Sequence, residues 1–261
     1  MESPAGGDIT LNDEKLIAQA PPLLQFPWLN HGCTTRHFSP PDANRADELQ
    51  HLRRSLALPE DTPILHAEQK HTSRVAVFRP EDLRQLTTDH RHVYRMSDGI
   101  ISAHPGVMLA ILTADCAAIF LADKRIHAIG LVHAGWKGTL GRIAEHAVGA
   151  MIREGSNAAD VVAWIGPMIG ACCYEVSPEM VEQFAAEFRD AADAGIQFTY
   201  GRHLDLVALN AYQLRIAGIP AANIHRSGVC TQHQKNTYYS FRGDLGTTGR
   251  IISALYCEPQ P

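Results

Sequence analysis

Three short apolar runs in the centre of the chain, residues 107–113, 117–122 and 126–133, limit the possible folds more than any other feature. They are rich in branched side chains and are separated by polar breaks. Runs of this length and composition are typical of buried β-strands. The break at residues 123–125 (Asp-Lys-Arg) has the character of a hairpin turn. The centre of the chain is therefore expected to contribute neighbouring strands to a buried sheet.

Helical patterns follow these strands. Apolar residues recur at helical spacing over residues 140–152, and Gly155 is a natural C-terminal stop. Ser177 followed by Pro178 predicts the start of a second helix, and Asp205 can cap a third. The other expected elements are a loop at 40–47, a helix at 48–56, and strands at 161–165, 224–230, 238–242 and 250–256.

Strands and helices alternate irregularly along this chain, and at least one strand pair is a hairpin. That pattern favours an α/β or α+β domain with mixed sheets over a regular doubly wound sheet. With 261 residues, of which 45% are hydrophobic, the chain can bury a sizeable core. Length alone does not choose between one large domain and two small ones. The polar segment 1–14, rich in Gly, Ser and Pro, is expected to be a flexible tail.

Charge and cysteine usage exclude several classes of protein. The net charge of −5 argues against broad binding to nucleic acid or to anionic membranes, because phosphate backbones require a basic surface. There is no signal-peptide pattern and no apolar run of transmembrane length, so we expect a cytoplasmic protein. The cysteines are too sparse and irregular for a disulfide scaffold and are expected to be thiols. They are Cys33, Cys116, Cys172, Cys173, Cys230 and Cys257.

Polar residues interrupt the strand pattern at three places. Asp115 and Cys116 lie between two apolar strands, His133 closes the next strand, and His71 follows the apolar pair at 64–65. A buried carboxylate is costly without a partner or a role, so Asp115 is a candidate proton carrier or partner of a ligand histidine. A thiol near imidazoles can be a nucleophile with its base or a ligand of zinc. A buried inert thiol and a helix-capping histidine are the structural alternatives, and spacing alone does not exclude them.

The segment His133-Ala-Gly-Trp-Lys-Gly138 adds features of an anion site. Gly135 and Gly138 allow the backbone to approach a ligand closely, and the following helix would offer free N–H groups. Lys137 would add a positive charge beside them.

Seven segments together resemble the laccase-domain, or polyphenol-oxidase-like, family over roughly residues 20 to 257. The ADC, HAGWxG and IGPxIG…YEV motifs are the most specific of them. The segments are EQKHTSRV, MSDGIIS, LTADCAAIFLAD, GLVHAGWKGTLGRI, WIGPMIGACCYEVS, GVCTQHQKNTYYSFR and GTTGRIISAL.

This resemblance implies a single catalytic domain, at 15–261, of mixed β-sheets flanked by helices. It implies a zinc site formed by His71, Cys116 and His133. Members of the family are described as purine nucleoside phosphorylases with adenosine deaminase and methylthioadenosine phosphorylase activities, so purine nucleosides and inorganic phosphate are the expected partners. Multicopper chemistry is not expected, because the chain's HxH pair, His90 and His92, has no Cys nearby.

The basic residues depart from the family pattern. Lys137 replaces the usual Arg of HAGWRG, Arg36 is followed by His-Phe rather than Gly-Gly, and Gly243 follows Arg242 where a second Arg is usual. Arg36, Lys137 and Arg242 remain the candidates for phosphate binding. Lys keeps the charge of Arg but loses its bidentate geometry. The departures bear on phosphate affinity and substrate range more than on metal binding.

Three alternatives stay open. A metal-free Cys–His amide hydrolase, as in peptidoglycan-precursor editing, would use Cys116 as nucleophile and His133 as base. A redox or metal sensor would be built on the adjacent Cys172 and Cys173. A degenerate family member would bind its ligand without turnover. The sequence does not indicate the oligomeric state.

Overall fold

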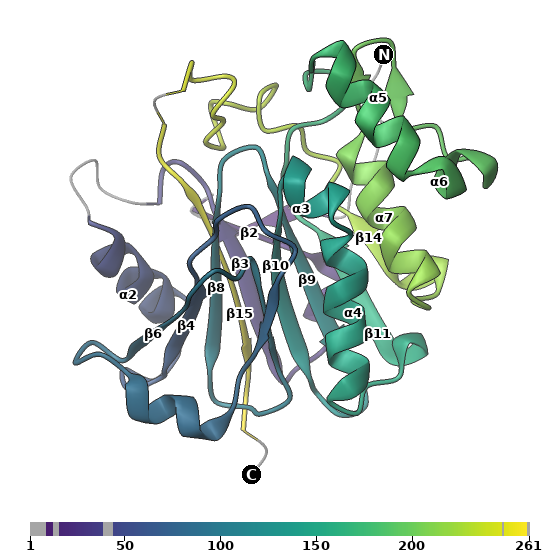
Figure 1. Cartoon of the computed structure of the whole chain (residues 1–261). Coiled ribbons are helices and arrows are strands. Elements are labelled where there is room, and N and C mark those ends of the chain that lie inside the picture. Colours follow the sequence, from purple (N-terminus) through teal and green to yellow (C-terminus); the bar gives the residue numbers. More distant parts are fainter. Residues whose placement is uncertain (1–8, 13–15, 39–43, 247, 260–261) are drawn as a thin grey trace.

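The computed structural model describes residues 9–12, 16–38, 44–246 and 248–259. Two mixed sheets form its centre, and a two-stranded ribbon lies apart from them (Figure 1). In order across the seven-stranded sheet, the strands are β1 (Thr10–Leu11), β2 (Ile17–Gln19), β3 (Leu29–Thr34), β15 (Ile251–Cys257), β8 (Met108–Thr113), β4 (Ile64–Ala67) and β6 (Arg91–Tyr94). The six-stranded sheet runs β14 (Ile224–Arg226), β11 (Val161–Ile165), β9 (Ala117–Asp123), β10 (Ile129–Ala134), β7 (Gly99–Ser102) and β5 (Val75–Val77). The ribbon pairs β12 (Thr199–Tyr200) with β13 (His203–Leu204).

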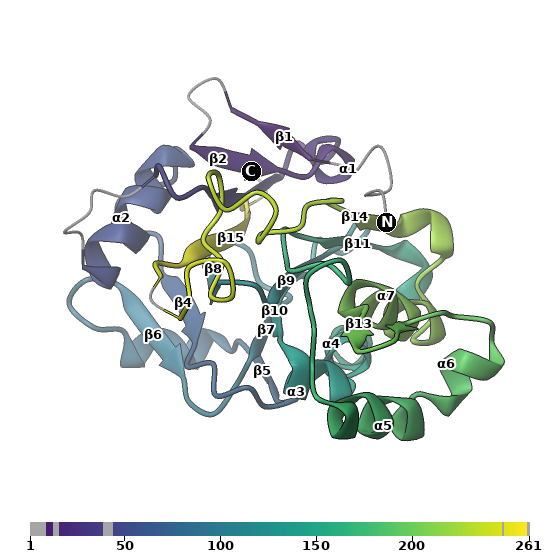
Figure 2. The ribbon, with the colours of Figure 1, turned by 90° about the horizontal axis from the view of Figure 1, so that it is seen from above.

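Helices cover the outer faces of the two sheets, as Figures 1 and 2 show from two directions. Helix α2 covers the seven-stranded sheet, whereas α4 and α7 cover the six-stranded one. The helices are α1 (Pro21–Leu24), α2 (Arg45–Ser55), α3 (Trp136–Leu140), α4 (Ile143–Arg153), α5 (Pro178–Glu187), α6 (Arg189–Asp193) and α7 (Leu206–Ile216). Short 3₁₀ turns occur at Pro80–Gln85, Ala158–Asp160 and Ala221–Asn223. The predicted fold class, mixed sheets flanked by helices, is confirmed.

The central strands are apolar throughout because both of their faces are buried. In β8, Leu109 and Ile111 face the core between the two sheets, whereas Met108 and Ala110 face the layer beneath α2. In β9, Phe120 lies in the core between the sheets, where it contacts Trp164 of β11. The predicted strands at 107–113, 117–122, 161–165 and 250–256 are confirmed to within a residue or two.

The third central strand begins later than predicted. Residues 126–128 belong to the hairpin connection, because the Asp123 carboxylate accepts the backbone N–H groups of Arg125 and Ile126. His127 then adopts a left-handed backbone (φ +58°) and stacks on Trp28 with 4.1 Å between ring centroids. Strand β10 therefore starts at Ile129.

The predicted helix at 140–152 corresponds mainly to α4, whereas its first residue, Leu140, belongs to the separate helix α3. Helix α3 ends at Leu140 and α4 starts at Ile143, with Arg142 between them in a left-handed conformation (φ +56°). The Arg142 guanidinium pairs with Glu145, Glu187 and Asp190, so the break is tied to α5 and α6. The predicted caps of the later helices are confirmed: Ser177 caps α5 and Asp205 caps α7.

The predicted strand at 238–242 is wrong, and the one at 224–230 is shorter than expected. The described residues between β14 and β15, 227–246 and 248–250, form a long loop of turns (the 227–250 loop), in which the N–H of Tyr238 bonds to the carbonyl of Gln234. The N–H of Arg242 goes to the Asp115 carboxylate instead of a neighbouring strand. This loop lies over the end of the sheets that carries the polar breaks (Figure 2).

Two predictions near the N-terminus fall partly outside the described residues. Of the predicted tail at 1–14, only residues 9–12 are described, and Thr10–Leu11 pair with β2. Of the predicted loop at 40–47, residues 40–43 are not described, and α2 already begins at Arg45. Within the described residues, no helix has the length and apolar character needed to cross a membrane.

Candidate metal centre

His71, Cys116 and His133 come together at one end of the two sheets. Their ligand atoms all lie within 4.8 Å of one another, and the two imidazole rings are 4.9 Å apart at 80°. His133 lies in β10, Cys116 directly precedes the neighbouring strand β9, and His71 lies in the loop after β4. The pairing of β9 with β10 therefore fixes two of the three residues, and a loop brings the third.

Gly135 is required by the close approach of these side chains. A Cβ atom at this position would lie 2.8 Å from the Sγ of Cys116 and 3.2 Å from the Cδ2 of His71. The first of these distances is shorter than real Cβ contacts, so a side chain here would displace the thiol. The absence of a side chain at Gly135 therefore leaves room for the Cys116 thiol and the His71 ring.

Asp98 organises two of the three residues. Its buried carboxylate lies 2.7 Å from Nδ1 of His133, so that this nitrogen carries a proton and leaves Nε2 of the neutral imidazole as the atom that can bind a cation. The same carboxylate accepts the backbone N–H groups of Lys70, His71 and Thr72 at 3.2, 3.0 and 2.7 Å. These bonds help to hold His71 in a left-handed backbone (φ +59°), which costs roughly 1–2 kcal/mol for a residue with a side chain.

Opposing charges shift the ionisation of this cluster. Burial alone would raise the pKa of Cys116, but His133 and His71 outweigh it and lower the pKa to about 6. Burial would lower the pKa of His133, whereas Asp98 and Cys116 raise it to about 9. Burial would also raise the pKa of Asp98, and the hydrogen bonds from His133 and Thr72 lower it to about 2. At neutral pH the metal-free protein therefore holds a thiolate next to an imidazolium.

The donor set fits a metal ion of borderline softness. One sulfur and two imidazole nitrogens converge, a carboxylate orients one imidazole from behind, and His71 is exposed to solvent. Three protein ligands with solvent access are typical of catalytic sites, which keep one coordination position open. The structure thus brings together the three residues that the sequence predicts as metal ligands, and metal binding by them stays a prediction.

Asp115 has a different neighbourhood from the one predicted for a partner of a ligand histidine. Its Oδ1 accepts a hydrogen bond from the Thr231 hydroxyl at 2.6 Å, and its Oδ2 accepts the N–H of Arg242 at 2.7 Å. Its carbonyl accepts the N–H of Ile169. Asp115 therefore ties the segment before Cys116 to two loops. The carboxylate that contacts a ligand histidine is that of Asp98, and a catalytic role for Asp115 stays a prediction.

The three predicted phosphate-binding residues differ in their contacts. The Arg36 guanidinium pairs with Asp244 at 2.7 Å and stacks over Tyr239, so its charge is already compensated. Lys137 is exposed in α3, with Nζ 5.3 Å from the centre of the Trp136 ring.

Of the three, Arg242 is hydrogen-bonded to the segment that carries Cys116, because its N–H donates to the carboxylate of Asp115. Its guanidinium donates to the carbonyl of Glu175 and lies over the Tyr174 ring. Tyr174 is buried, and Cys116 contributes to raising its pKa to about 12, although burial is the larger cause. Phosphate binding by Arg36, Lys137 and Arg242 stays a prediction.

Sequence reasoning did not single out Asp98 and gave the role of partner to a ligand histidine to Asp115 instead. The available signal was its place in the sequence. Asp98 comes directly before β7, whose residues are all buried, and β7 pairs with β10, the strand that carries His133. An acid at such a strand start is costly unless several donors surround it.

The chain is similar to several known proteins. A family model described as multi-copper polyphenol oxidoreductase laccase matches residues 29–258. The purine nucleoside phosphorylase YlmD of Bacillus subtilis is 34% identical over 191 residues, which cover 72% of this chain and 69% of that protein. The adenosine deaminase RL5 of an unknown prokaryotic organism is 35% identical over 196 residues, 74% of each chain.

Two solved structures resemble the whole chain. The hypothetical protein YfiH of Bacillus licheniformis superposes with a TM-score of 0.84 at 27% identity, covering 97% of this chain and all of that one. YlmD of Geobacillus stearothermophilus superposes with a TM-score of 0.82, also at 27% identity and with the same coverage of this chain.

Proposed function

This chain belongs to the multi-copper polyphenol oxidoreductase laccase family, and from that membership and its Cys–His–His site we propose that it is a zinc-dependent purine nucleoside phosphorylase. Adenosine, inosine and methylthioadenosine are the proposed substrates, with inorganic phosphate as co-substrate and adenosine deamination as a second reaction. The relatives' names, which include both purine nucleoside phosphorylase and adenosine deaminase, support this choice. The observation that carries the proposal is the convergence of His71, Cys116 and His133 in front of Asp98.

Zinc is the proposed metal because one thiolate and two imidazoles form a ligand set that suits it. A cluster of copper ions would need more histidines. When bound, zinc would supply Lewis-acid chemistry to the site. His71, Cys116 and His133 would hold it. Asp98 would keep the proton of His133 on Nδ1, and Gly135 leaves the room that the Cys116 thiol occupies.

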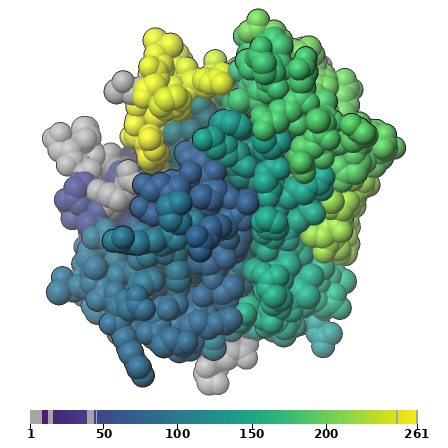
Figure 3. Space-filling view, viewed as in Figure 1, coloured from purple at the N-terminus to yellow at the C-terminus, as the bar shows by residue number. Residues whose placement is uncertain are grey.

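The reaction itself places further demands on the chain. In phosphorolysis, phosphate oxygen attacks C1′ of the ribose while the bond from C1′ to the purine breaks, so the protein must bind an anion beside the sugar. Lys137 is a cation on α3, and Arg242 is a cation on the 227–250 loop whose N–H binds the carboxylate of Asp115, the residue before Cys116. In Figure 3 this yellow C-terminal loop stands above blue and teal residues at the top of the molecule. Arg36 would act on the same loop through Asp244.

We also propose that the protein acts in the cytoplasm. The six cysteines are free thiols; Cys172 is exposed, and Cys116 and Cys173 are partly exposed. A reducing compartment suits such a protein, because exposed thiols persist there.

The assay that tests the function measures free base from adenosine, inosine and methylthioadenosine, each with and without phosphate. Adenine or hypoxanthine that appears only with phosphate is the expected product. Inosine formed from adenosine without phosphate would indicate deamination. If no nucleoside is consumed under any condition by zinc-loaded protein, the proposed function is wrong.

Two ligand variants connect this activity to the metal. Cys116→Ala and His133→Ala should each abolish zinc binding at this site and lower activity at least about a hundredfold, the upper range for loss of a supporting residue around a metal. Cys257→Ala is a matched control, because Cys257 is a buried cysteine of β15 outside the site. Activity that survives both ligand variants would contradict a metal-dependent mechanism.

One observation favours the rival function, a metal-free amide hydrolase. Without metal, Cys116 is a thiolate beside an imidazolium, which is the form that a Cys–His nucleophile needs. Because the pKa of Cys116 is lowered, its alkylation by iodoacetamide in chelator-treated protein should rise with pH around a midpoint of about 6. Zinc should suppress that alkylation. Protein purified without chelator that contains no zinc, and whose Cys116 reacts with the same midpoint, would favour the hydrolase.

A further inference from the structure

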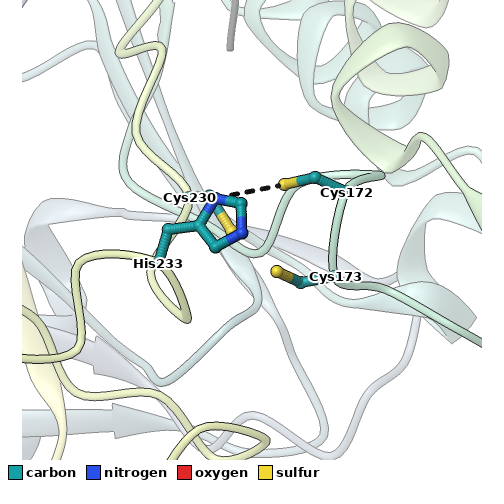
Figure 4. Close-up of side chains that lie close together, drawn as sticks. All are labelled: Cys172, Cys173, Cys230 and His233. Carbon is teal, nitrogen blue, oxygen red and sulfur yellow. Dashed lines mark hydrogen bonds between the residues drawn. The ribbon is translucent and has the colours of Figure 1, made fainter. Parts of the chain in front are cut away.

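A second group of thiols and an imidazole lies outside the centre described above. Cys172, Cys173, Cys230 and His233 point toward one another (Figure 4), and their ligand atoms all lie within 4.8 Å of one another. The Sγ of Cys172 is 3.7 Å from Nδ1 of His233. Four metal-ligating side chains are thus gathered into one small volume.

Two loops bring these residues together. Cys172 and Cys173 lie in a turn in which the N–H of Cys173 bonds to the carbonyl of Gly170, so both side chains can face the same side. In an extended strand, adjacent side chains would point to opposite faces. The other loop carries Cys230 and His233. A β-bridge between Met168 and Cys230 connects it to the segment before the turn, and the N–H of Gly170 lies 3.3 Å from the Sγ of Cys230.

We propose that Cys172, Cys173, Cys230 and His233 bind a second zinc ion, which has a structural role. Three cysteines and one histidine form one of the usual ligand sets of structural zinc, which is four-coordinate and closed. With Zn–S distances of about 2.3 Å, tetrahedral geometry places neighbouring sulfurs about 3.8 Å apart. The observed grouping within 4.8 Å needs only small side-chain movements to reach this geometry.

The surroundings of the cluster fit a bound ion. A Cβ atom on Gly170 would lie 3.2 Å from the Sγ of Cys172, so the absence of a side chain there leaves the thiols room to converge. Cys230 is buried, whereas His233 is exposed. A surface pocket lined by Ala171, Cys172, Tyr200, His203 and His233 gives solvent access to the cluster. A metal ion could therefore enter from this side.

A disulfide explains the grouping less well. A disulfide between two of the cysteines would not account for the third thiol and the imidazole, which lie in the same cluster. A bond between the adjacent Cys172 and Cys173 would also be strained. A metal ion would use all four side chains.

The consequence of the second ion would be a clamp between two loops that border the first site. The 170–176 segment carries Tyr174 and Glu175, and the 227–250 loop carries Arg242, whose guanidinium contacts both residues. Removing the ion should therefore loosen Arg242 without removing any ligand of the first site.

Zinc content per chain, measured by plasma mass spectrometry on full-length protein after reconstitution with zinc, tests the proposal. We expect two equivalents in the wild type, in accord with the two ligand groups. His233→Ala and Cys172→Ala, at exposed positions, should each leave one equivalent, and Cys116→Ala should also leave one. Cobalt bound to Cys116→Ala should show the intense thiolate-to-metal absorption of a site with several sulfurs, whereas cobalt bound to His233→Ala should show a weaker one. Cys257→Ala is the control and should keep both equivalents.

Two results would overturn the proposal. One is a wild type that holds a single equivalent, which Cys116→Ala abolishes and His233→Ala leaves in place. The other is a disulfide that joins Cys230 to Cys172 or Cys173 in protein purified with zinc, detected by mass mapping without reductant. Neither result bears on nucleoside turnover, which depends on the first site.

Discussion

Two residues of the cluster around Cys116 lie at the ends of paired strands, whereas the residues of the cluster around Cys172 lie in turns and loops. In the first, β9 and β10 set the positions of Cys116 and His133, and Asp98 holds both His133 and the His71 loop by hydrogen bonds. In the second, turn and bridge hydrogen bonds hold the backbone, and His233 lies exposed on its loop. The first site is thus held by hydrogen bonds within the protein, whereas the second would gain much of its order from the metal.

This difference separates the two roles. An open three-ligand site that does not depend on the ion for its shape can keep a coordination position for substrate. A four-ligand site on loops contributes binding free energy to local structure, because the ion connects segments that are otherwise joined by few bonds. The effect of removing a supporting residue should therefore differ between the clusters.

Among the residues that support the two clusters without being ligands, the largest effect is expected from Asp98→Asn. Asparagine presents an N–H₂ group or a single carbonyl where the carboxylate now accepts bonds from His133 and from the His71 loop, so zinc affinity at the first site should fall about 10- to 100-fold. Competition with a chromophoric chelator measures this change. The second site should keep its affinity.

Asp123→Asn is the matched control for that variant. Asp123 is also buried, and its carboxylate also accepts backbone N–H groups, but in a hairpin turn away from both clusters. If Asp123→Asn weakens zinc binding as much as Asp98→Asn, the loss reflects general destabilisation and the supporting role of Asp98 is wrong.

Asp115 connects the two regions and should give the next largest effect. It precedes Cys116, and its carboxylate binds the hydroxyl of Thr231, next to Cys230, and the N–H of Arg242. In Asp115→Asn one of these donors loses its acceptor, and a buried unsatisfied group costs about 1–3 kcal/mol. Urea denaturation should show this loss in the free energy of unfolding.

The same variant tests what Asp115 does in the reaction. If it only connects the loops, zinc content and most of the turnover number should survive Asp115→Asn. Turnover lost in full from a variant that keeps both zinc equivalents and unfolds normally would instead indicate that Asp115 carries a proton.

The contrast between strand ends and irregular loops also explains which parts of the site could be predicted from the sequence. Cys116 and His133 are recognisable because polar residues stand at the ends of apolar strands, and strand pairing is a regular geometry. His71 was singled out with them, and the family resemblance made it the third ligand. Asp98 is harder to recognise, since its role depends on five hydrogen bonds from segments distant in the sequence. The grouping of Cys172 with Cys230 depends on two irregular loops, for which no periodicity exists.

The errors in the fold have the same origin. Residues 238–242 have the composition of a strand, but Tyr238 and Ser240 are buried in a loop whose N–H groups find partners in turns and in Asp115. The helix expected at 140–152 keeps its periodicity across Gly141, yet the ion pairs of Arg142 hold a break there. Tertiary contacts, which a local pattern does not contain, decided both cases.

The smallest effect is expected from a change at Lys137, which is, like Arg242, a candidate for phosphate binding. Unlike Arg242, which both loops hold, Lys137 is exposed on α3. Arginine at this position would restore bidentate geometry toward a phosphate, so Lys137→Arg should lower the KM for phosphate about two- to fivefold, roughly the worth of one net hydrogen bond. Turnover at saturating phosphate should change little, and initial rates over a range of phosphate concentrations measure both constants. Lys124→Arg, at a surface lysine paired with Asp160, is the matched control and should change neither. If Lys137→Arg also leaves the KM for phosphate unchanged, Lys137 does not contact the anion, and Arg242 becomes the stronger candidate.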